Sequence, residues 1–125
     1  MTDDSAFKEH IRVSLLKMGL LVEKCVNHKL DVNQFTKEYG NFFYYEALDG
    51  HEANAEQARV FDQYRESINF HRHIQQDVVD KVYVGSCEQE EEYLKSGRIS
   101  KSEANERLKM YWNQYQTVIY ALETK

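Results

Sequence analysis

The 125-residue chain has the usual size of one domain, so we expect a single domain spanning residues 1–125. Its 42% hydrophobic and 30% charged residues exclude a disordered chain, and the absence of proline removes the commonest helix breaker. A net charge of −5 argues against direct nucleic-acid binding and favours a protein partner with a basic surface.

The first predicted helix covers residues 5–28, where apolar residues recur at steps of three and four. That spacing places them on one helical face: Phe7, Ile11, Leu15, Met18, Val22 and Cys25. A second helix is predicted over residues 31–48, because Asp31 and Gln34 have the spacing of a capping box. Gly40 weakens this helix and allows a close helix approach.

The third predicted helix covers residues 53–82 and is the longest. At 1.5 Å per residue it would span about 40 Å, more than the diameter of a compact domain of this size, so we expect it to kink or protrude. A short acidic helix from Ser86 to Gly97 follows, and the last helix begins after the Ser100 cap and runs almost to Lys125. The sequence therefore predicts an all-α fold, an antiparallel bundle of four to five helices with one long central helix.

Residues 25–43 resemble residues 94–112, since both read as a helix, a tight basic turn, a capping residue and a second helix. Leu30 and Ile99 occupy matching positions just before the two caps, where each can act as a hydrophobic staple. Two similar helical hairpins without a common ancestor explain the pattern better than a duplication.

Metal, cofactor and catalytic motifs are not evident. His71 and His73 point about 200° apart around a helix, so they cannot share an ion, and we interpret His71 as a partly buried, hydrogen-bonded histidine. Cys25 and Cys87 are interpreted as reduced, buried small residues. No glycine-rich phosphate loop and no nucleophile with an adjacent base is present, so we expect neither an enzyme nor a cofactor.

Acidic and aromatic residues cluster in two segments, and Tyr44 and Tyr45 are adjacent, so at least one of them should be exposed. Solvated charge at helix ends explains many of the acids, but a tyrosine beside carboxylates is also how binding hot spots are built. The predicted partner-binding residues are Tyr44, Tyr45, Glu46, Asp49, Glu88, Glu90, Glu91 and Glu92.

The first residues lack a basic and apolar leader, and no apolar run approaches the length of a membrane span. We therefore expect a soluble, cytoplasmic protein that does not bind a membrane.

The segments LVEKCVNHKLDVNQFTKEYGNFFYY (residues 21–45) and RVFDQYRESINFHRHIQQDV (residues 59–78) resemble bacterial colicin-like immunity proteins. In that family a helix and a short polar turn lead to a helix with a Phe-x-x-x-Tyr pattern. A long helix that begins with an aromatic pair follows. The resemblance implies a small acidic antitoxin that masks the basic cleft of a toxin or nuclease domain. The segment from Ser86 onward departs from the family pattern, and no site residue is carried over.

Two other functions remain open from the residues alone. The chain could be a structural or regulatory helical module that forms a homodimer through its long third helix. Alternatively, it could be a metal-binding helical enzyme, which requires histidines and carboxylates to converge in space.

Overall fold

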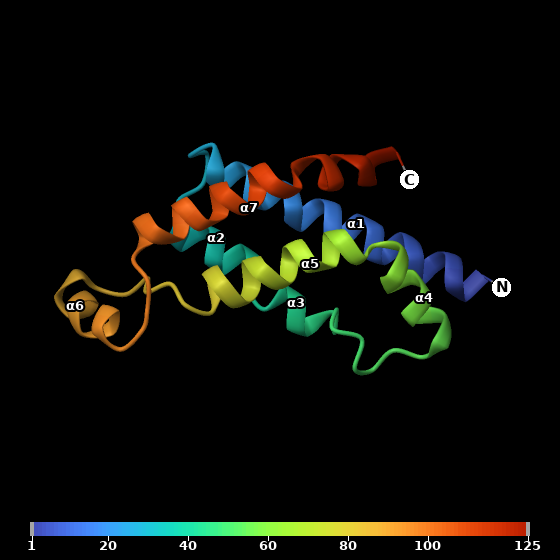
Figure 1. The fold of residues 1–125 in the computed structure, drawn as a ribbon, viewed down its shortest axis with the longest axis horizontal. Coiled ribbons are helices and arrows are strands. Elements are labelled where there is room, and N and C mark those ends of the chain that lie inside the picture. The colour runs from blue at the N-terminus through green and yellow to red at the C-terminus, as the bar shows by residue number, and fades with distance from the viewer. Residues whose placement is uncertain (1, 125) are drawn as a thin grey trace.

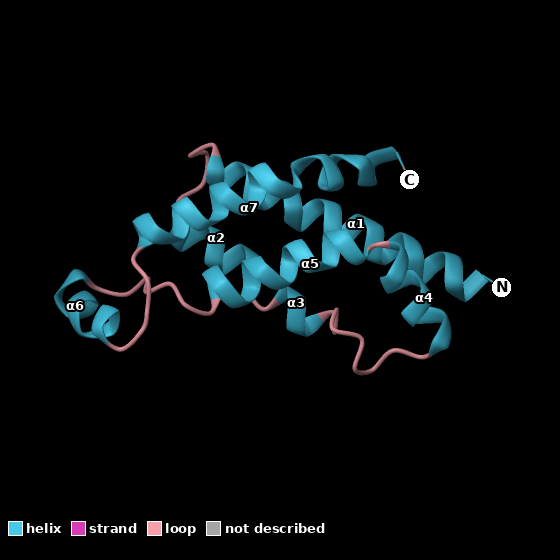
Figure 2. Cartoon of the chain, viewed as in Figure 1, coloured by secondary structure: helices cyan, strands magenta, loops and turns pink. Residues whose placement is uncertain are grey.

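The chain is built from α-helices joined by loops, as Figures 1 and 2 show. The computed structural model describes residues 2–124, and no β-strand is found among them beyond an isolated bridge between Val82 and Ile99. The all-α class expected from the sequence is therefore confirmed. The elements are α1 (Thr2–Val26), α2 (Val32–Tyr39), α3 (Phe42–Tyr45), α4 (Ala55–Gln63), α5 (Arg65–Ile74), the π-helical turn η1 (Gln75–Val79), α6 (Cys87–Lys95), α7 (Lys101–Ala121) and the 3-10 turn η2 (Leu122–Thr124).

Helices α1 and α7 form the framework of the molecule. They pack against each other and run in opposite directions (Figure 1). The predicted face of the first helix is the buried one, since Ile11, Leu15 and Val22 are almost inaccessible to solvent. The Ser100 hydroxyl caps α7 by accepting a hydrogen bond from the Glu103 amide at 3.0 Å. The last predicted helical residue, Lys125, lies outside the described residues.

The second predicted helix, residues 31–48, is divided into α2 and α3. Asp31 caps α2 as expected, and its carboxylate accepts from the Gln34 amide at 2.7 Å. Gly40 then takes a φ of +58°, which glycine adopts without steric cost, and α2 ends there. The expectation of one continuous helix is wrong because this glycine terminates the helix.

The third predicted helix, residues 53–82, is interrupted. Asn54 and Gln57 form a reciprocal capping box that starts α4. Tyr64 leaves the helical conformation, with φ −110° and ψ 25°, and separates α4 from α5. The expected kink is present, and it lets α4 pack against α1. The expectation of one long central helix is wrong, because α1 with 25 residues is longer than any segment here.

One hydrophobic core joins α1, α2, α5 and α7. Helix α5 packs against both framework helices, and α2 packs against α1. Aromatic rings contribute much of the interior, where each can remove a large apolar area from water. The buried aromatic residues are Phe35, Tyr39, Phe42, Phe43, Phe61, Tyr64, Phe70 and Trp112.

Helix α6 lies apart from this core, at one end of the molecule (Figure 1). None of its residues is buried, whereas α2 folds back onto α1. Leu30 and Ile99, the two predicted staples, both pack partly buried against the core. The similarity between residues 25–43 and 94–112 therefore describes two turns and not two equivalently packed hairpins.

Among the described residues, no helix is both long enough and apolar enough to cross a lipid bilayer.

Candidate functional site

The predicted partner-binding residues fall into two groups that the fold keeps apart. Tyr44, Tyr45, Glu46 and Asp49 lie on α3 and the turn after it, near the middle of the molecule. The four glutamates between residues 88 and 92 lie on α6 at its end (Figure 1). The structure therefore does not join the eight residues into one surface.

Both tyrosines of α3 are accessible, whereas their adjacency predicted exposure of at least one. Tyr45 is 85% exposed and projects from the surface. Tyr44 is 48% exposed, and its hydroxyl donates a hydrogen bond to the Asp80 carboxylate at 2.5 Å. This hydrogen bond to the Asp80 carboxylate raises the pKa of Tyr44 to about 12.

The two acids of this first group are already paired within the chain. Glu46 contacts His10 of α1, whose Nε2 lies 2.9 and 3.1 Å from the two carboxylate oxygens. Asp49 pairs with His51, and this contact holds the pKa of Asp49 below its usual value and raises that of His51. Tyr45 is thus the member of this group with most free surface.

The second group belongs to a projecting segment that we call the acidic arm, residues 83–98. Glu88, Glu91 and Glu92 are exposed and Glu90 is half-buried, while the adjacent Tyr93 and Leu94 are about 40% exposed. Carboxylates at the start of a helix interact favourably with its dipole, which explains why α6 tolerates so much negative charge. The arm presents acidic and apolar groups together.

A narrow neck attaches the arm to the core. The Tyr83 amide donates to the Ile99 carbonyl at 2.9 Å, and the Ile99 amide donates to the Lys81 carbonyl at 3.0 Å. Arg98 reaches across the neck and donates to the Asp80 carbonyl at 2.7 Å. These bonds close the base of the arm and set the direction in which it leaves the core.

The π-helical turn η1 lies beside this neck and orders the polar groups around it. The side-chain amide of the buried Gln75 donates a hydrogen bond to the Asp80 carboxylate at 2.9 Å. The Tyr111 hydroxyl of α7 donates one to the Asp77 carboxylate. Burial, together with this hydrogen bond, raises the pKa of Tyr111 to about 12. Asp80 therefore connects α3, through Tyr44, to the base of the arm.

Sequence reasoning missed this role of η1 and of the two carboxylates, Asp77 within it and Asp80 directly after it. The Tyr44–Asp80 pair is separated by 36 residues and the Tyr111–Asp77 pair by 34, so no local spacing could reveal them. Both aspartates lie near the end of a predicted helix, and this was the only sequence signal for the two contacts. Carboxylates exposed to solvent occur at helix ends equally often, so the signal does not distinguish the two cases.

His71 is a structural residue of the core, as predicted, although its burial is complete. Its Nδ1 lies 2.6 Å from the Tyr39 hydroxyl, and its Nε2 lies 3.0 Å from the Leu15 carbonyl. A carbonyl can only accept, so Nε2 carries the proton and Nδ1 accepts from Tyr39. Burial lowers the pKa of His71 to about 4, which keeps the ring neutral.

His73 points away from His71, as the helical spacing required. Its ring stacks on Tyr111 at 4.8 Å, and its Nδ1 lies 3.7 Å from the Asp77 carboxylate. Over residues 2–124, no three histidine, cysteine, aspartate or glutamate side chains gather where they could hold a metal ion.

The two cysteines differ in environment and are not bonded to each other. Cys25 is buried, and burial raises the pKa of its thiol to about 11. Cys87 is exposed at the start of α6, so the expectation that both are buried is wrong for this residue. The projection of the arm exposes it.

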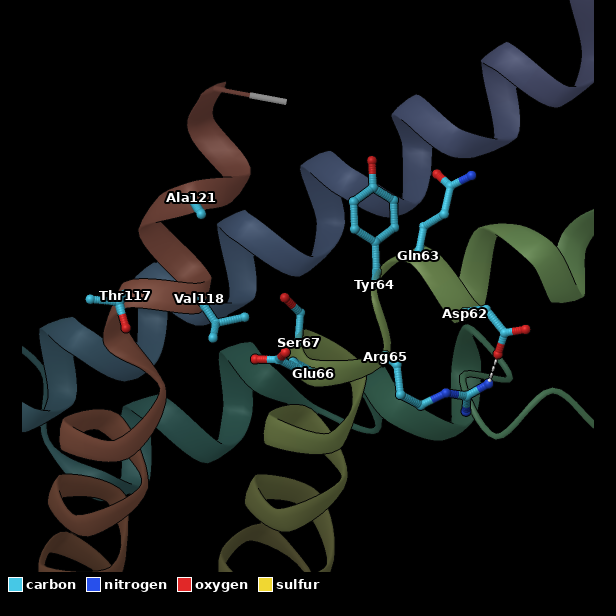
Figure 3. Close-up of a pocket in the computed structure, with 9 residues that line it drawn as sticks. All are labelled: Asp62, Gln63, Tyr64, Arg65, Glu66, Ser67, Thr117, Val118 and Ala121. Atoms are coloured by element: carbon cyan, nitrogen blue, oxygen red, sulfur yellow. Dashed lines mark hydrogen bonds and ion pairs between the residues drawn. The ribbon is translucent and has the colours of Figure 1, made fainter.

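A groove of about 370 Å³ lies between the α4–α5 junction and the end of α7 (Figure 3). Asp62 and Arg65 on its rim pair with each other, and the buried Ser67 directs its hydroxyl into it. The lining side chains include no histidine or cysteine that could act as a base beside Ser67. They are Asp62, Gln63, Tyr64, Arg65, Glu66, Ser67, Thr117, Val118 and Ala121.

Comparison of the chain with protein-family models, with curated proteins and with solved structures finds no match. The similarity of residues 21–45 and 59–78 to colicin-like immunity proteins stays a prediction.

Proposed function

We propose that this chain is a small acidic binding protein of the immunity or antitoxin type, acting in the cytoplasm. An antiparallel helical bundle serves as the scaffold, and the acidic arm docks onto the basic site of a toxin or nuclease domain and masks it. The protein acts by binding and not by catalysis.

The observation that carries this proposal is the unburied state of α6. A nine-residue helix is marginally stable in water by itself, and helices in proteins gain most of their stability by burying an apolar face. Helix α6 buries no residue in its own chain, and Leu94 and Tyr93 stay about 40% exposed although the Tyr93 ring stacks on Tyr83 at 4.5 Å. A partner that covers these side chains would supply the missing contacts.

The negative charge of the arm favours a partner with a basic surface. The arm carries Glu88, Glu90, Glu91 and Glu92, and Lys95 pairs with one of them, Glu91, at 3.5 Å. A basic cleft would attract this surface at long range and accelerate association, as complementary charges do between proteins. Tyr45 offers a second, aromatic contact point of the kind found at the centre of interfaces.

Co-expression with a basic toxin domain encoded beside this chain's gene tests the proposal. The intact chain should co-purify with the toxin domain and protect cells from it. A variant in which a Gly–Ser linker replaces residues 83–98 should stay folded, because the arm buries little, and should lose both properties.

A charge variant sharpens the same test. Glu90→Lys/Glu91→Lys should lower the association rate with the toxin domain about tenfold or more at low salt, because electrostatic steering is lost. Glu106→Lys/Glu123→Lys makes the same net change outside the arm, on α7 and η2, and serves as the matched control. Full protection by the armless variant, or equal effects of the two charge variants, would refute the role of the arm.

A further inference from the structure

A second surface of the chain has the opposite character to the arm. A groove of about 430 Å³ runs between α1 and α2, and we call it the α1–α2 groove. It is lined by Lys17, Met18, Leu20, Leu21, Lys24 and Glu38. The lysines are seven residues apart on α1 and therefore lie on one helical face, with the leucines between them.

The two lysines of this groove outnumber its single carboxylate, Glu38, so the lining carries a net positive charge. Lys17 and Lys24 are exposed, and neither forms an ion pair with another residue of the described part of the chain. The neighbouring apolar side chains are only half-buried. On a protein with a net charge of −5, this is an apolar groove whose lining has one positive charge in excess.

Helix α6 has the complementary pattern. Glu90, Tyr93 and Leu94 follow the i, i+3, i+4 spacing of one helical face, and Glu91 lies beside Leu94 on its edge. This face carries two carboxylates and two side chains that are about 40% exposed, although Glu91 also pairs with Lys95 and the Tyr93 ring stacks on Tyr83 at 4.5 Å. It matches the two lysines and the leucines of the α1–α2 groove in both charge and polarity.

We propose that the α1–α2 groove receives the acidic arm of a second copy of this chain. Within one chain the arm leaves the core through the neck at Val82 and Ile99 and does not pack against α1. Each copy has one arm and one groove, so two copies can exchange arms reciprocally and form a closed dimer with twofold symmetry.

This dimer goes beyond the proposed function and adds a regulatory consequence. Two arms that occupy each other's grooves are covered, so a basic partner has to compete with the dimer for them. The free chain would then be stored as a dimer and would bind its partner as a monomer.

Light scattering coupled to size-exclusion chromatography tests the dimer on the full chain alone. At low salt and high protein concentration, the mass should be twice the 14.9 kDa of the chain, and it should fall toward the monomer mass as salt rises. A monomer under all these conditions overturns the proposal.

Charge-reversal variants of the α1–α2 groove and of the acidic arm test whether these two surfaces contact each other. Lys17→Glu/Lys24→Glu gives an acidic groove and Glu90→Lys/Glu91→Lys gives a basic arm, and each variant alone should weaken the dimer about tenfold or more. An equimolar mixture should form the heterodimer, because both of its arm–groove contacts are again complementary. Homodimers at wild-type strength, or a mixture that remains monomeric, contradict the assignment.

Two control variants separate this contact from general charge effects. Glu88→Lys/Glu92→Lys changes the opposite face of α6, and Lys8→Glu/Lys109→Glu changes lysines outside the groove. Both should retain the dimer, and loss of dimer in either would place the contact elsewhere. All measurements use the chain without a toxin domain, so failure of the dimer leaves the toxin experiments unaffected.

Discussion

At the scale of single residues, the interior is organised around the neutral ring of His71. Phe42 and Phe70 pack edge-on against it at 5.1 and 5.0 Å, while Tyr39 and the Leu15 carbonyl satisfy its two nitrogens. A charged imidazole here would have to reverse its hydrogen bond with Tyr39 and would be buried without solvation among apolar rings. The protein therefore depends on this histidine remaining unprotonated.

Stability should fall as the pH drops from about 6.5 to about 4. The pKa of His71 in the folded protein is about 4, below the ordinary value of 6.5, so the unfolded chain takes up the proton first. The stabilisation is therefore complete above pH 6.5 and decreases by about 3 kcal/mol across this window. Urea unfolding at several pH values measures this change in the free energy of unfolding. His71→Gln, which cannot titrate, should flatten the profile; an unchanged slope would show that other groups are responsible.

The Tyr39 hydroxyl should contribute measurably to stability. Tyr39→Phe removes the donor to His71 Nδ1 and leaves a buried nitrogen without its partner, which costs about 1–2 kcal/mol. Tyr45→Phe makes the same chemical change at an 85% exposed position and should change the free energy of unfolding by less than about 0.5 kcal/mol. Equal effects in chemical denaturation would argue against this role for the Tyr39–His71 bond.

At the scale of secondary-structure elements, the contact between α1 and α7 depends on Gly19. A β-carbon at this position would lie 2.7 Å from Cγ2 of Ile119, which is fully buried on α7. Gly19 lies in the middle of the longest helix, where alanine would be the better helix former. The close approach of α1 and α7 therefore leaves no room for a β-carbon at this position, which explains the glycine.

Gly19→Ala should destabilise the protein by about 1 kcal/mol. The gain in helix propensity is about 1 kcal/mol, but overpacking against Ile119 costs about 1–3 kcal/mol. In an Ile119→Ala background the clash is absent, so the same Gly19→Ala change should become stabilising. A double-mutant cycle from urea unfolding measures this coupling, and additive effects would contradict the proposed clash.

At the scale of the whole molecule, stability is distributed unevenly between the core and the acidic arm. The core contains the buried faces of α1, α5 and α7, whereas α6 has no buried residue and connects through a short neck. Regions with few buried contacts open with a smaller free energy than the global unfolding step. The arm is thus able to adjust to a partner without disturbing the helices that support it.

Hydrogen exchange should show this difference directly. Amides of residues 87–95 should exchange many times faster than those in the middle of α1 and α7, whose opening should approach the free energy of global unfolding. Measurement at protein concentrations that keep the chain monomeric avoids protection from self-association. Arm amides as protected as those of α1 would show that α6 is part of the cooperative core.

Two helix starts, at Asp31 and Ser100, could be predicted from the sequence, but the Ser86 side chain does not cap α6 as its spacing to Gln89 suggested, and much of the candidate site could not be predicted. Asp31 and Ser100 each accept from the amide three residues later, so a short segment is enough to predict them, and the Asn54 cap of α4 has the same spacing but was not predicted. Tyr44 and Asp80 meet only because the fold brings α3 beside η1. The exposure of Tyr45 followed from its adjacency to Tyr44, whereas the pairing of Glu46 with the distant His10 had no local signal.

The sequence by itself determined the helical class, the buried face of α1 and the interior position of His71, because apolar spacing and capping act within a few residues. Tertiary structure alone decided that the chain bends at Tyr64 and that α6 leaves the core instead of packing as α2 does. These outcomes depend on which surfaces of distant segments fit together, and the energy of such contacts is not encoded in any single stretch of the chain.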